Sequence, residues 1–303
     1  MHFCDVMISN RKVDLMIIGA QKSGTTSLKN YLGQHPEIIT HLQTEFTYFL
    51  PSSEDGDNID FIFKFYFPVV VSEKKARLVA KSAAMYVEEE SLRRLKSANP
   101  DCPVVLLLRN PVDRAYSSYL MEVNSGFYEK HWSAITNTLK RAKRGERDQM
   151  FKLFIQMGMY AEHLKNIYNY YSKENVLIFL FEEFKSNPEK VCKVLFNRLG
   201  VDDTFIPDTS KRYNPAKRPR IRPVSRFITN LRRNDNPFKR LIKRALPPAT
   251  FTKMGNWVVN SVSQLHEPAS MAPDIRDQLV EFFRPYNEEL MNMTGLKIDH
   301  WNQ

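Results

Sequence analysis

The chain has 303 residues, of which 43% are hydrophobic and 26% are charged, as is usual for a folded protein. This composition excludes fibrous, collagen-like and largely disordered chains. The formal net charge is +10, but the excess lies between Lys211 and Arg244, where 13 Lys and Arg residues accompany one acid, Asp235. A uniformly basic nucleic-acid-binding surface is therefore a poor interpretation, and no nucleic-acid partner is expected.

The three cysteines, Cys4, Cys102 and Cys192, form no CxxC pair. This argues against a disulfide framework and a thiolate metal site, so no metal is expected. The N-terminal residues lack the apolar stretch of a signal peptide, and no run of about 18 apolar residues suits a transmembrane helix. We therefore expect a soluble, cytoplasmic protein without a transmembrane segment.

Short apolar runs alternate with helical patterns along the chain. The predicted strands are 15–18, 77–80, 104–108 and 176–180. The predicted helices are 23–33, 114–123, 151–171, 188–199 and 273–293. The run 104–108 is apolar throughout, as in a strand buried on both faces. The alternation predicts an α/β fold in which a parallel sheet is flanked by helices, as a single domain over residues 1–303.

The first informative loop, residues 19–27, follows the first predicted strand and opens a helix, which is the usual setting of a phosphate-binding loop. Its sequence is Gly-Ala-Gln-Lys-Ser-Gly-Thr-Thr-Ser. Backbone N–H groups at such a helix start bind anions, and small residues let a phosphate approach. In the nucleoside-triphosphatase P-loop, Lys directly follows the second Gly, whereas here Thr25 holds that place and Lys22 precedes Gly24. The alternative is an ordinary strand-to-helix turn.

The second informative loop, residues 109–118, follows the apolar run 104–108. Arg109 would emerge at the carboxyl edge of the sheet, and Ser117 would lie on the next helix, so the two could bind one more phosphate. Alternatively, Arg109 only pairs with Asp113. An ATP-dependent small-molecule kinase is a competing hypothesis, but Mg²⁺-nucleotide chemistry favours an Asp where Arg109 stands.

The segments QKSGTTSL and LLLRNPVDRAYSSY resemble the 5′- and 3′-phosphate loops of sulfotransferases that use 3′-phosphoadenosine 5′-phosphosulfate (PAPS), in the glycan-type and bacterial branch. The resemblance implies a P-loop-like sheet and transfer of a sulfuryl group to a hydroxyl or amine of a carbohydrate, glycolipid or natural product, with 3′,5′-adenosine bisphosphate as product. The segment 211–244 would cover the nucleotide. The residues implied to bind PAPS are Gln21, Lys22, Ser23, Gly24, Thr25, Thr26, Ser27, Arg109, Ser117, Tyr213, Lys217 and Arg218.

The same resemblance implies four catalytic candidates. Lys22 would stabilise the leaving phosphate oxygen, and Glu45 would be the base that accepts the proton of the acceptor. Lys81 matches a lysine near the acceptor in glycan-type members, but Ala80 stands where a Glu commonly precedes it, so its partner is missing. His41 is the next candidate for the base. The remaining alternative is a polyanion-binding protein that works through its basic segment.

Overall fold

The computed structural model describes residues 12–51, 66–67, 76–124, 133–211, 213, 217–219, 263–265 and 270–303. The chain divides into two compact units. The first comprises Met1–Arg109 and Tyr160–Asn214, and the second comprises Asn110–Met159 and Pro215–Gln303. That one functional domain spans residues 1–303 stays a prediction.

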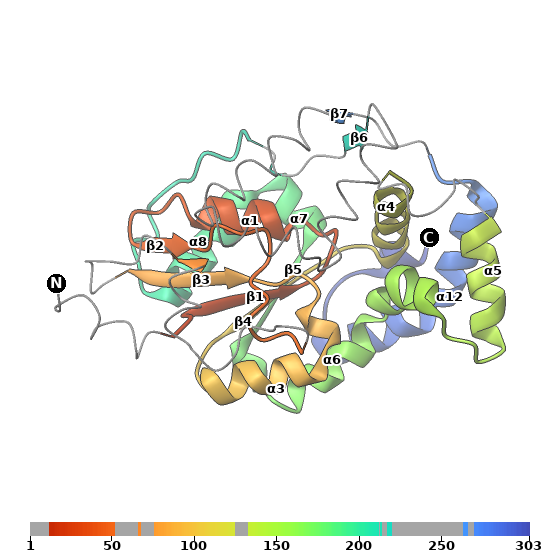
Figure 1. The fold of residues 1–303 in the computed structure, drawn as a ribbon, viewed down its shortest axis with the longest axis horizontal. Coiled ribbons are helices and arrows are strands. Elements are labelled where there is room, and N and C mark those ends of the chain that lie inside the picture. The colour runs from red at the N-terminus through yellow and green to blue at the C-terminus, as the bar shows by residue number, and fades with distance from the viewer. Residues whose placement is uncertain are drawn as a thin grey trace, which may run out of the picture. The chain divides into compact units, whose positions relative to one another are not determined.

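The first unit is built on a five-stranded sheet in the order β2-β3-β1-β4-β5, and all neighbouring strands are parallel (Figure 1). The strands are β1 (Leu15–Gly19), β2 (Ile38–Thr40), β3 (Arg77–Lys81), β4 (Val104–Leu108) and β5 (Val176–Leu180). The predicted parallel α/β sheet and its four predicted strands are confirmed. Sequence reasoning missed β2, because a strand of three residues is too short to show a periodic pattern.

Helices cover both faces of this sheet. They are α1 (Thr25–Leu32), α3 (Glu89–Ala98), α6 (Tyr160–Tyr168), α7 (Phe181–Ser186) and α8 (Pro188–Leu199), with 3₁₀ turns at Met85–Val87 and Lys173–Asn175. Helices α1 and α8 lie over one face, and α3 and α6 lie over the other (Figure 1). The bounds of α8 agree with the prediction, because Asn187 Oδ1 accepts from Lys190 N–H at its start and Gly200, with φ of 66°, ends it.

The second unit is mainly helical. Its elements are α4 (Pro111–Asn124), α5 (Ser133–Lys143), α12 (Pro273–Thr294), a π-helical turn at Phe151–Ile155, 3₁₀ turns at Gln156–Gly158 and Asp299–Asn302, and the antiparallel strands β6 (Lys217–Pro219) and β7 (Ser263–Leu265). Helix α4 begins three residues before its predicted start. Proline suits the first helical position, and Asn110 Oδ1 accepts from Val112 N–H there.

Two predictions in the second unit are wrong. The predicted helix 151–171 is interrupted, because Gly158 lies against the Phe283 ring, 2.9 Å from where a Cβ would be, and Met159 leaves the helical conformation with ψ of 62°. Tertiary packing here overrides the helical pattern. Pro215, Pro219 and Pro223 predict a loop in the first half of the basic segment, but Lys217 and Arg218 lie on β6. Most of the segment 211–244 lies outside the described residues.

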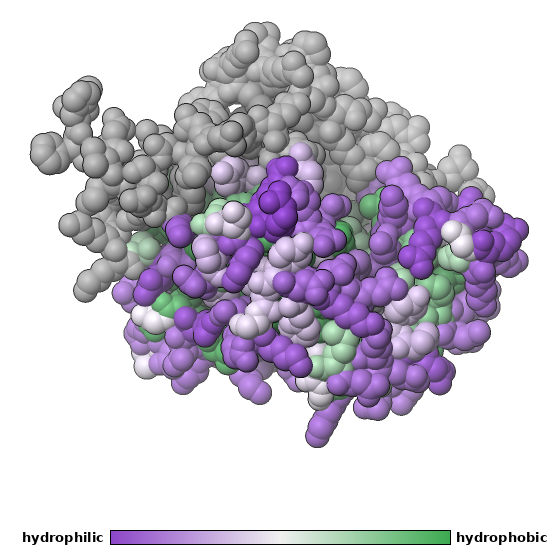
Figure 2. Space-filling model, turned by 90° about the horizontal axis from the view of Figure 1, so that it is seen from below, coloured by the Kyte–Doolittle hydropathy of each residue, from purple (hydrophilic) through white to green (hydrophobic). Residues whose placement is uncertain are grey.

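The surface shown in Figure 2 is predominantly hydrophilic, and its apolar residues form small scattered patches. Among the described residues, the large apolar side chains that are exposed are Leu42, Val194 and Ile206. Burial raises the pKa of the Cys102 and Cys192 thiols to about 12, so both remain protonated near neutral pH. Within the described ranges, no helix combines the length and the apolar character that a membrane span needs.

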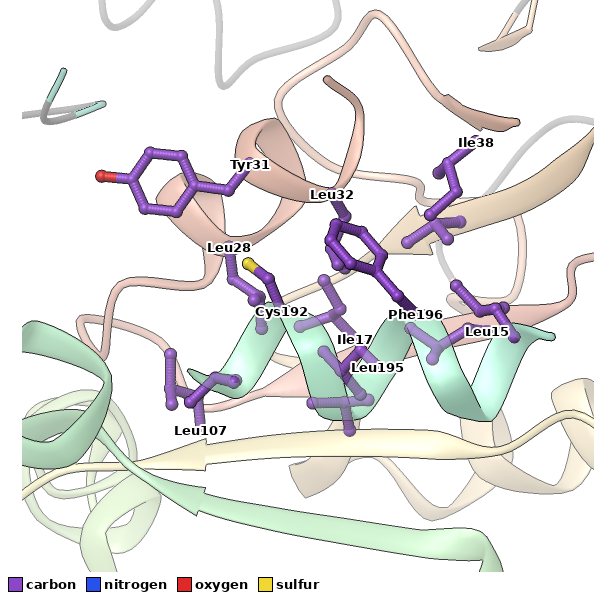
Figure 3. Packing of buried hydrophobic residues seen from close by; sticks show 14 of the residues in the cluster. Leu15, Ile17, Leu28, Tyr31, Leu32, Ile38, Leu107, Cys192, Leu195 and Phe196 are labelled. Atoms are coloured by element: carbon purple, nitrogen blue, oxygen red, sulfur yellow. The ribbon is translucent and has the colours of Figure 1, made fainter. Parts of the chain in front are cut away.

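A buried apolar cluster joins α1 and α8 to one face of the sheet (Figure 3). Alternate residues of β1, Leu15 and Ile17, point into it, as the two-residue period of a strand requires. Leu28 of α1 and Leu195 and Phe196 of α8 complete the contact. This packing fixes α1 on the sheet and therefore fixes the loop that leads into it.

We expect Phe196→Ala to lower the free energy of unfolding by about 3–5 kcal/mol, because it removes a fully buried ring and leaves a cavity. The ring of Phe196 lies 4.8 Å from that of His35 and 6.0 Å from that of Phe205, so neighbouring side chains leave little freedom to collapse. Urea denaturation measures this change. The control is Val194→Ala on the exposed side of α8, which should cost under about 1 kcal/mol.

Candidate functional site

The carboxyl ends of all five strands emerge at one edge of the sheet, because the strands are parallel. Ala20 follows β1, His41 follows β2, Lys81 closes β3, Arg109 follows β4 and Phe181 follows β5. The edge therefore gathers His41, Lys81 and Arg109, three of the predicted site residues, with the loop after β1. Open α/β sheets bind ligands at this edge.

The loop after β1 has an unusual backbone. Lys22 adopts φ of 72° and Gly24 adopts φ of 86°, both in the left-handed region. For a residue with a side chain, this conformation costs about 1–2 kcal/mol, and such strain is often retained at functional sites. At Gly24 a Cβ would lie 3.1 Å from the Phe181 ring, so both conformation and space favour glycine.

Several polar groups of this loop lack partners within the described part of the chain. Ser23 Oγ and Gln21 Oε1 are buried and have no hydrogen-bond partner there. Leaving such a group unsatisfied costs about 1–3 kcal/mol. The N–H groups of the first turn of α1, from Thr25 to Ser27, have no acceptor within the helix. The Ser23 hydroxyl and the helix N–H groups can donate hydrogen bonds and so fit a phosphate-bearing ligand, whereas Gln21 Oε1 can only accept.

Arg109 links the end of β4 to this loop. Its Nη1 donates to the Lys22 carbonyl oxygen over 3.1 Å, and its guanidinium carbon lies 5.1 Å from the centre of the Phe181 ring. Its own carbonyl accepts from the Tyr160 hydroxyl at 3.0 Å. Asp113, the alternative partner considered from the sequence, accepts from Arg276 within the second unit. Arg109 is thus held beside the predicted phosphate loop.

The remaining residues predicted to bind the donor lie in different places. Tyr213 belongs to the first unit, where its carbonyl accepts from Ser27 Oγ at 3.3 Å and its ring packs edge-on against Tyr31 of α1. Ser117 lies on α4, and Lys217 and Arg218 lie on β6, all in the second unit. That these three contribute to the same site stays a prediction.

Glu45 and Lys81 form an ion pair at the end of β3. Lys81 Nζ lies 2.5 Å from Glu45 Oε1, and Glu45 Oε2 accepts from the Ala83 N–H at 2.8 Å. The Lys81 side chain is 1% exposed, whereas that of Glu45 is 37% exposed. The expectation that Lys81 lacks a partner is therefore wrong, because Glu45 supplies one from a distant position in the chain. Burial lowers the pKa of Lys81, and Glu45 opposes that shift.

His41 is buried next to the backbone of Lys81. Its Nε2 accepts from the Lys81 backbone N–H at 3.1 Å. Burial, reinforced by the charges of Lys29 and Lys81, lowers the pKa of His41 well below its usual range. The ring is thus neutral, and the lone pair that a base would use is already engaged. The geometry favours Glu45 over His41 as the proton acceptor.

Sequence reasoning missed Lys29 and Phe181. Lys29 Nζ donates to the carbonyl oxygens of His41 at 2.8 Å and Gln43 at 3.1 Å, and burial, followed by the charge of Lys81, lowers its pKa to about 8. A lone lysine beside an apolar helix face gives no signal of this role. Phe181 had a signal, because it is the first residue after an apolar strand.

The aromatic run 61–67 of the sequence predicts core packing, with an acceptor-pocket wall as the alternative. Its described members, Tyr66 and Phe67, are buried, and their ring centres lie 4.7 Å and 5.8 Å from that of Phe46. This confirms core packing for these two residues, while 61–65 lie outside the described residues. Across the described ranges, no group of His, Cys, Asp and Glu is arranged to hold a metal ion.

Residues 12–214 match the family model described as the sulfotransferase domain. Among curated proteins, the chain is 28% identical over 217 residues to bifunctional heparan sulfate N-deacetylase/N-sulfotransferase 4 of Mus musculus, covering 67% of this chain and 24% of that protein. It is also 28% identical over 215 residues to the corresponding enzyme 1 of Homo sapiens, with the same coverage. The chain thus matches about a quarter of the length of these relatives.

A solved structure shares the fold. The crystal structure of a sulfotransferase from Alicyclobacillus acidocaldarius aligns with a TM-score of 0.67 and 22% identity, covering 97% of this chain and all of that one. At this identity, the likeness concerns the fold alone.

The unequal burial of Glu45 and Lys81 predicts unequal effects of their removal. We expect Glu45→Gln to lower the free energy of unfolding by about 2 kcal/mol, because it leaves the buried ammonium without a counter-charge. Lys81→Met should cost under about 1 kcal/mol, because the exposed carboxylate of Glu45 can turn to water. Urea denaturation of both variants at pH 7 measures the difference.

The pH dependence provides the control. Burial holds the pKa of Lys81 in the folded protein below its ordinary value of 10.5. At a pH between the folded and unfolded pKa values of Lys81, the unfolded chain therefore binds more protons than the folded protein. In that pH range the free energy of unfolding rises with pH. Removing the Glu45 charge lowers the pKa of Lys81 in the folded protein further and widens this pH range. The loss in the free energy of unfolding caused by Glu45→Gln should therefore shrink as the pH rises from about 7 to about 9.5. A larger loss for Lys81→Met than for Glu45→Gln would contradict this interpretation of the pair.

Proposed function

The chain belongs to the sulfotransferase family, whose model matches residues 12–214, and we propose that it transfers a sulfuryl group from PAPS to a hydroxyl or amine. The acceptor classes proposed are a carbohydrate, a glycolipid and a natural product. The matched relatives are named for N-sulfation of heparan sulfate, which makes a glycan with free amines a suitable first acceptor to assay.

The strongest support for PAPS as donor is the loop after β1. PAPS would present a phosphosulfate to this loop and supply an activated sulfuryl group. The buried Ser23 hydroxyl, which lacks a partner in the described structure, supports this proposal, because it can donate to a phosphosulfate oxygen. The N–H groups at the start of α1 supply donors for the 5′-phosphate. Arg109, fixed beside the same loop, is the proposed ligand of the 3′-phosphate.

The proposed transfer breaks the bond between sulfur and the 5′-phosphate oxygen while the acceptor oxygen or nitrogen attacks in line. Negative charge grows on the leaving oxygen, so a fixed cation there stabilises the transition state more than the ground state. Lys22, in the loop itself, is the proposed cation. Its strained backbone supports this assignment, because such conformations persist where a function requires them.

Glu45 is the proposed base. Its two carboxylate oxygens are anchored by Lys81 Nζ and the Ala83 N–H, yet the side chain is still partly exposed, so the carboxylate is oriented and can meet an acceptor. Each carboxylate oxygen has more than one lone pair, which leaves capacity to accept the acceptor's proton. Lys81, whose ammonium is buried, acts by orienting Glu45.

Donor binding is the direct test of the proposed function. We expect 3′,5′-adenosine bisphosphate to raise the melting temperature of the protein by several degrees at a concentration well above its dissociation constant. Adenosine 5′-monophosphate, which lacks the 3′-phosphate, should give a smaller shift, and EDTA should not change either result. Protection by ATP–Mg²⁺ but not by the bisphosphate would instead favour the kinase, and protection by heparin alone would favour a polyanion-binding protein.

Lys22→Ala should lower kcat for sulfuryl transfer by about 10²–10³-fold, which is the usual effect of losing one transition-state donor. The dissociation constant of 3′,5′-adenosine bisphosphate should rise by less than about tenfold, since that product lacks the developing charge. Transfer from labelled PAPS and isothermal titration measure the two quantities. Lys193→Ala, at an exposed lysine of α8, is the matched control. Equal losses in binding and turnover would make Lys22 an anchor only.

A further inference from the structure

We propose that Lys29 is a positioning residue for Glu45. Lys29 links α1, the helix that follows the donor loop, to the segment 41–45, which carries the proposed base. This proposal rests on the proposed function. No part of the resemblance assigns a role to Lys29. Its side chain is almost fully buried, although α1 already has a complete apolar face in Leu28, Tyr31 and Leu32. Burying an ammonium group is costly, so its presence needs a reason.

The reason lies in what the ammonium group holds. Lys29 Nζ donates to the carbonyl oxygens of His41 and Gln43, the residues four and two positions before Glu45. An apolar side chain at this place would remove both of these hydrogen bonds. Because Lys29 follows the donor loop by one helical turn, the two hydrogen bonds fix the segment 41–45 relative to that loop.

The same segment is also bonded to β3, at both of its ends. His41 Nε2 accepts from Lys81 N–H, Phe46 N–H donates to the Lys81 carbonyl oxygen at 2.7 Å, and Lys81 Nζ pairs with Glu45. The segment is therefore bonded on one side to α1 and on the other to β3. Leu42 N–H also donates to the Tyr66 carbonyl oxygen at 3.1 Å. Removing the Lys29 ammonium would break the side-chain hydrogen bonds from α1, and Glu45 would lose this link to the donor loop.

The charges in this cluster agree with that role. The charged groups that act on Lys29 within the described residues are Lys81 and Glu45, and the nearby His41 ring is neutral. The negative charge of Glu45 favours the protonated form of Lys29, while burial and Lys81 oppose it and lower its pKa to about 8. The ammonium thus retains its charge at neutral pH through the groups that it positions.

The first readout is amide hydrogen exchange, which does not depend on transfer activity. In Lys29→Met, peptides that cover residues 41–50 and 81–86 should exchange at least about fivefold faster, because the segment has lost its bonds to α1. Peptides from β4 and α8 should exchange as in the wild type. Lys29→Arg, which keeps donors and charge, should restore part of the protection, and Lys193→Met, at an exposed lysine, should change nothing.

The second readout is the division between turnover and donor binding. We expect Lys29→Met to lower kcat at least tenfold while the dissociation constant of 3′,5′-adenosine bisphosphate changes by less than about twofold, because the loop itself is intact. Lys29→Arg should recover part of kcat. Unchanged exchange over residues 41–50, unchanged kcat, or an equal loss of kcat and bisphosphate affinity would each overturn the proposal. If the wild-type protein transfers no sulfuryl group, the proposed function fails, and the exchange result alone decides whether Lys29 holds the segment.

Discussion

The arrangement of the first unit depends on one constraint, that all five strands of its sheet run parallel. Parallel pairing sends every strand towards the same edge, so residues that are far apart in the sequence meet there without any long-range motif. The loop after β1, Lys81 at the end of β3 and Arg109 after β4 are brought together in this way. The apolar packing of α1 and α8 against one face then holds the first of these elements in place.

Strands that are apolar throughout could be predicted to the residue, as 104–108 and 176–180 show, because a continuous apolar run of five residues is a plain pattern. Short or interrupted elements could not. Strand β2 has three residues, and the break at Gly158 depends on the Phe283 ring, which comes from a helix more than a hundred residues later. Local patterns carry no information on such contacts.

The same distinction between local patterns and distant contacts decides which residues of the candidate site could be predicted. Residues that belong to a contiguous loop, such as Lys22 and Ser23, could be proposed from the sequence, because loop chemistry is local. The partner of Lys81 could not, since the sequence suggested an adjacent residue, whereas Glu45 reaches it across a loop. Lys29 was invisible for a similar reason, as its acceptors are backbone carbonyl groups that any residue could supply.

Phe181 has a consequence for how such a site could be transferred between proteins. Its ring lies against Gly24 of one loop and against the Arg109 guanidinium of another, although Phe181 itself follows a third strand, β5. The Phe181 ring therefore helps to set the distance between the two loops that we propose bind the phosphates. A graft of only these two loops into another parallel sheet would lack this spacer. To keep their separation, the graft would also need the end of β5.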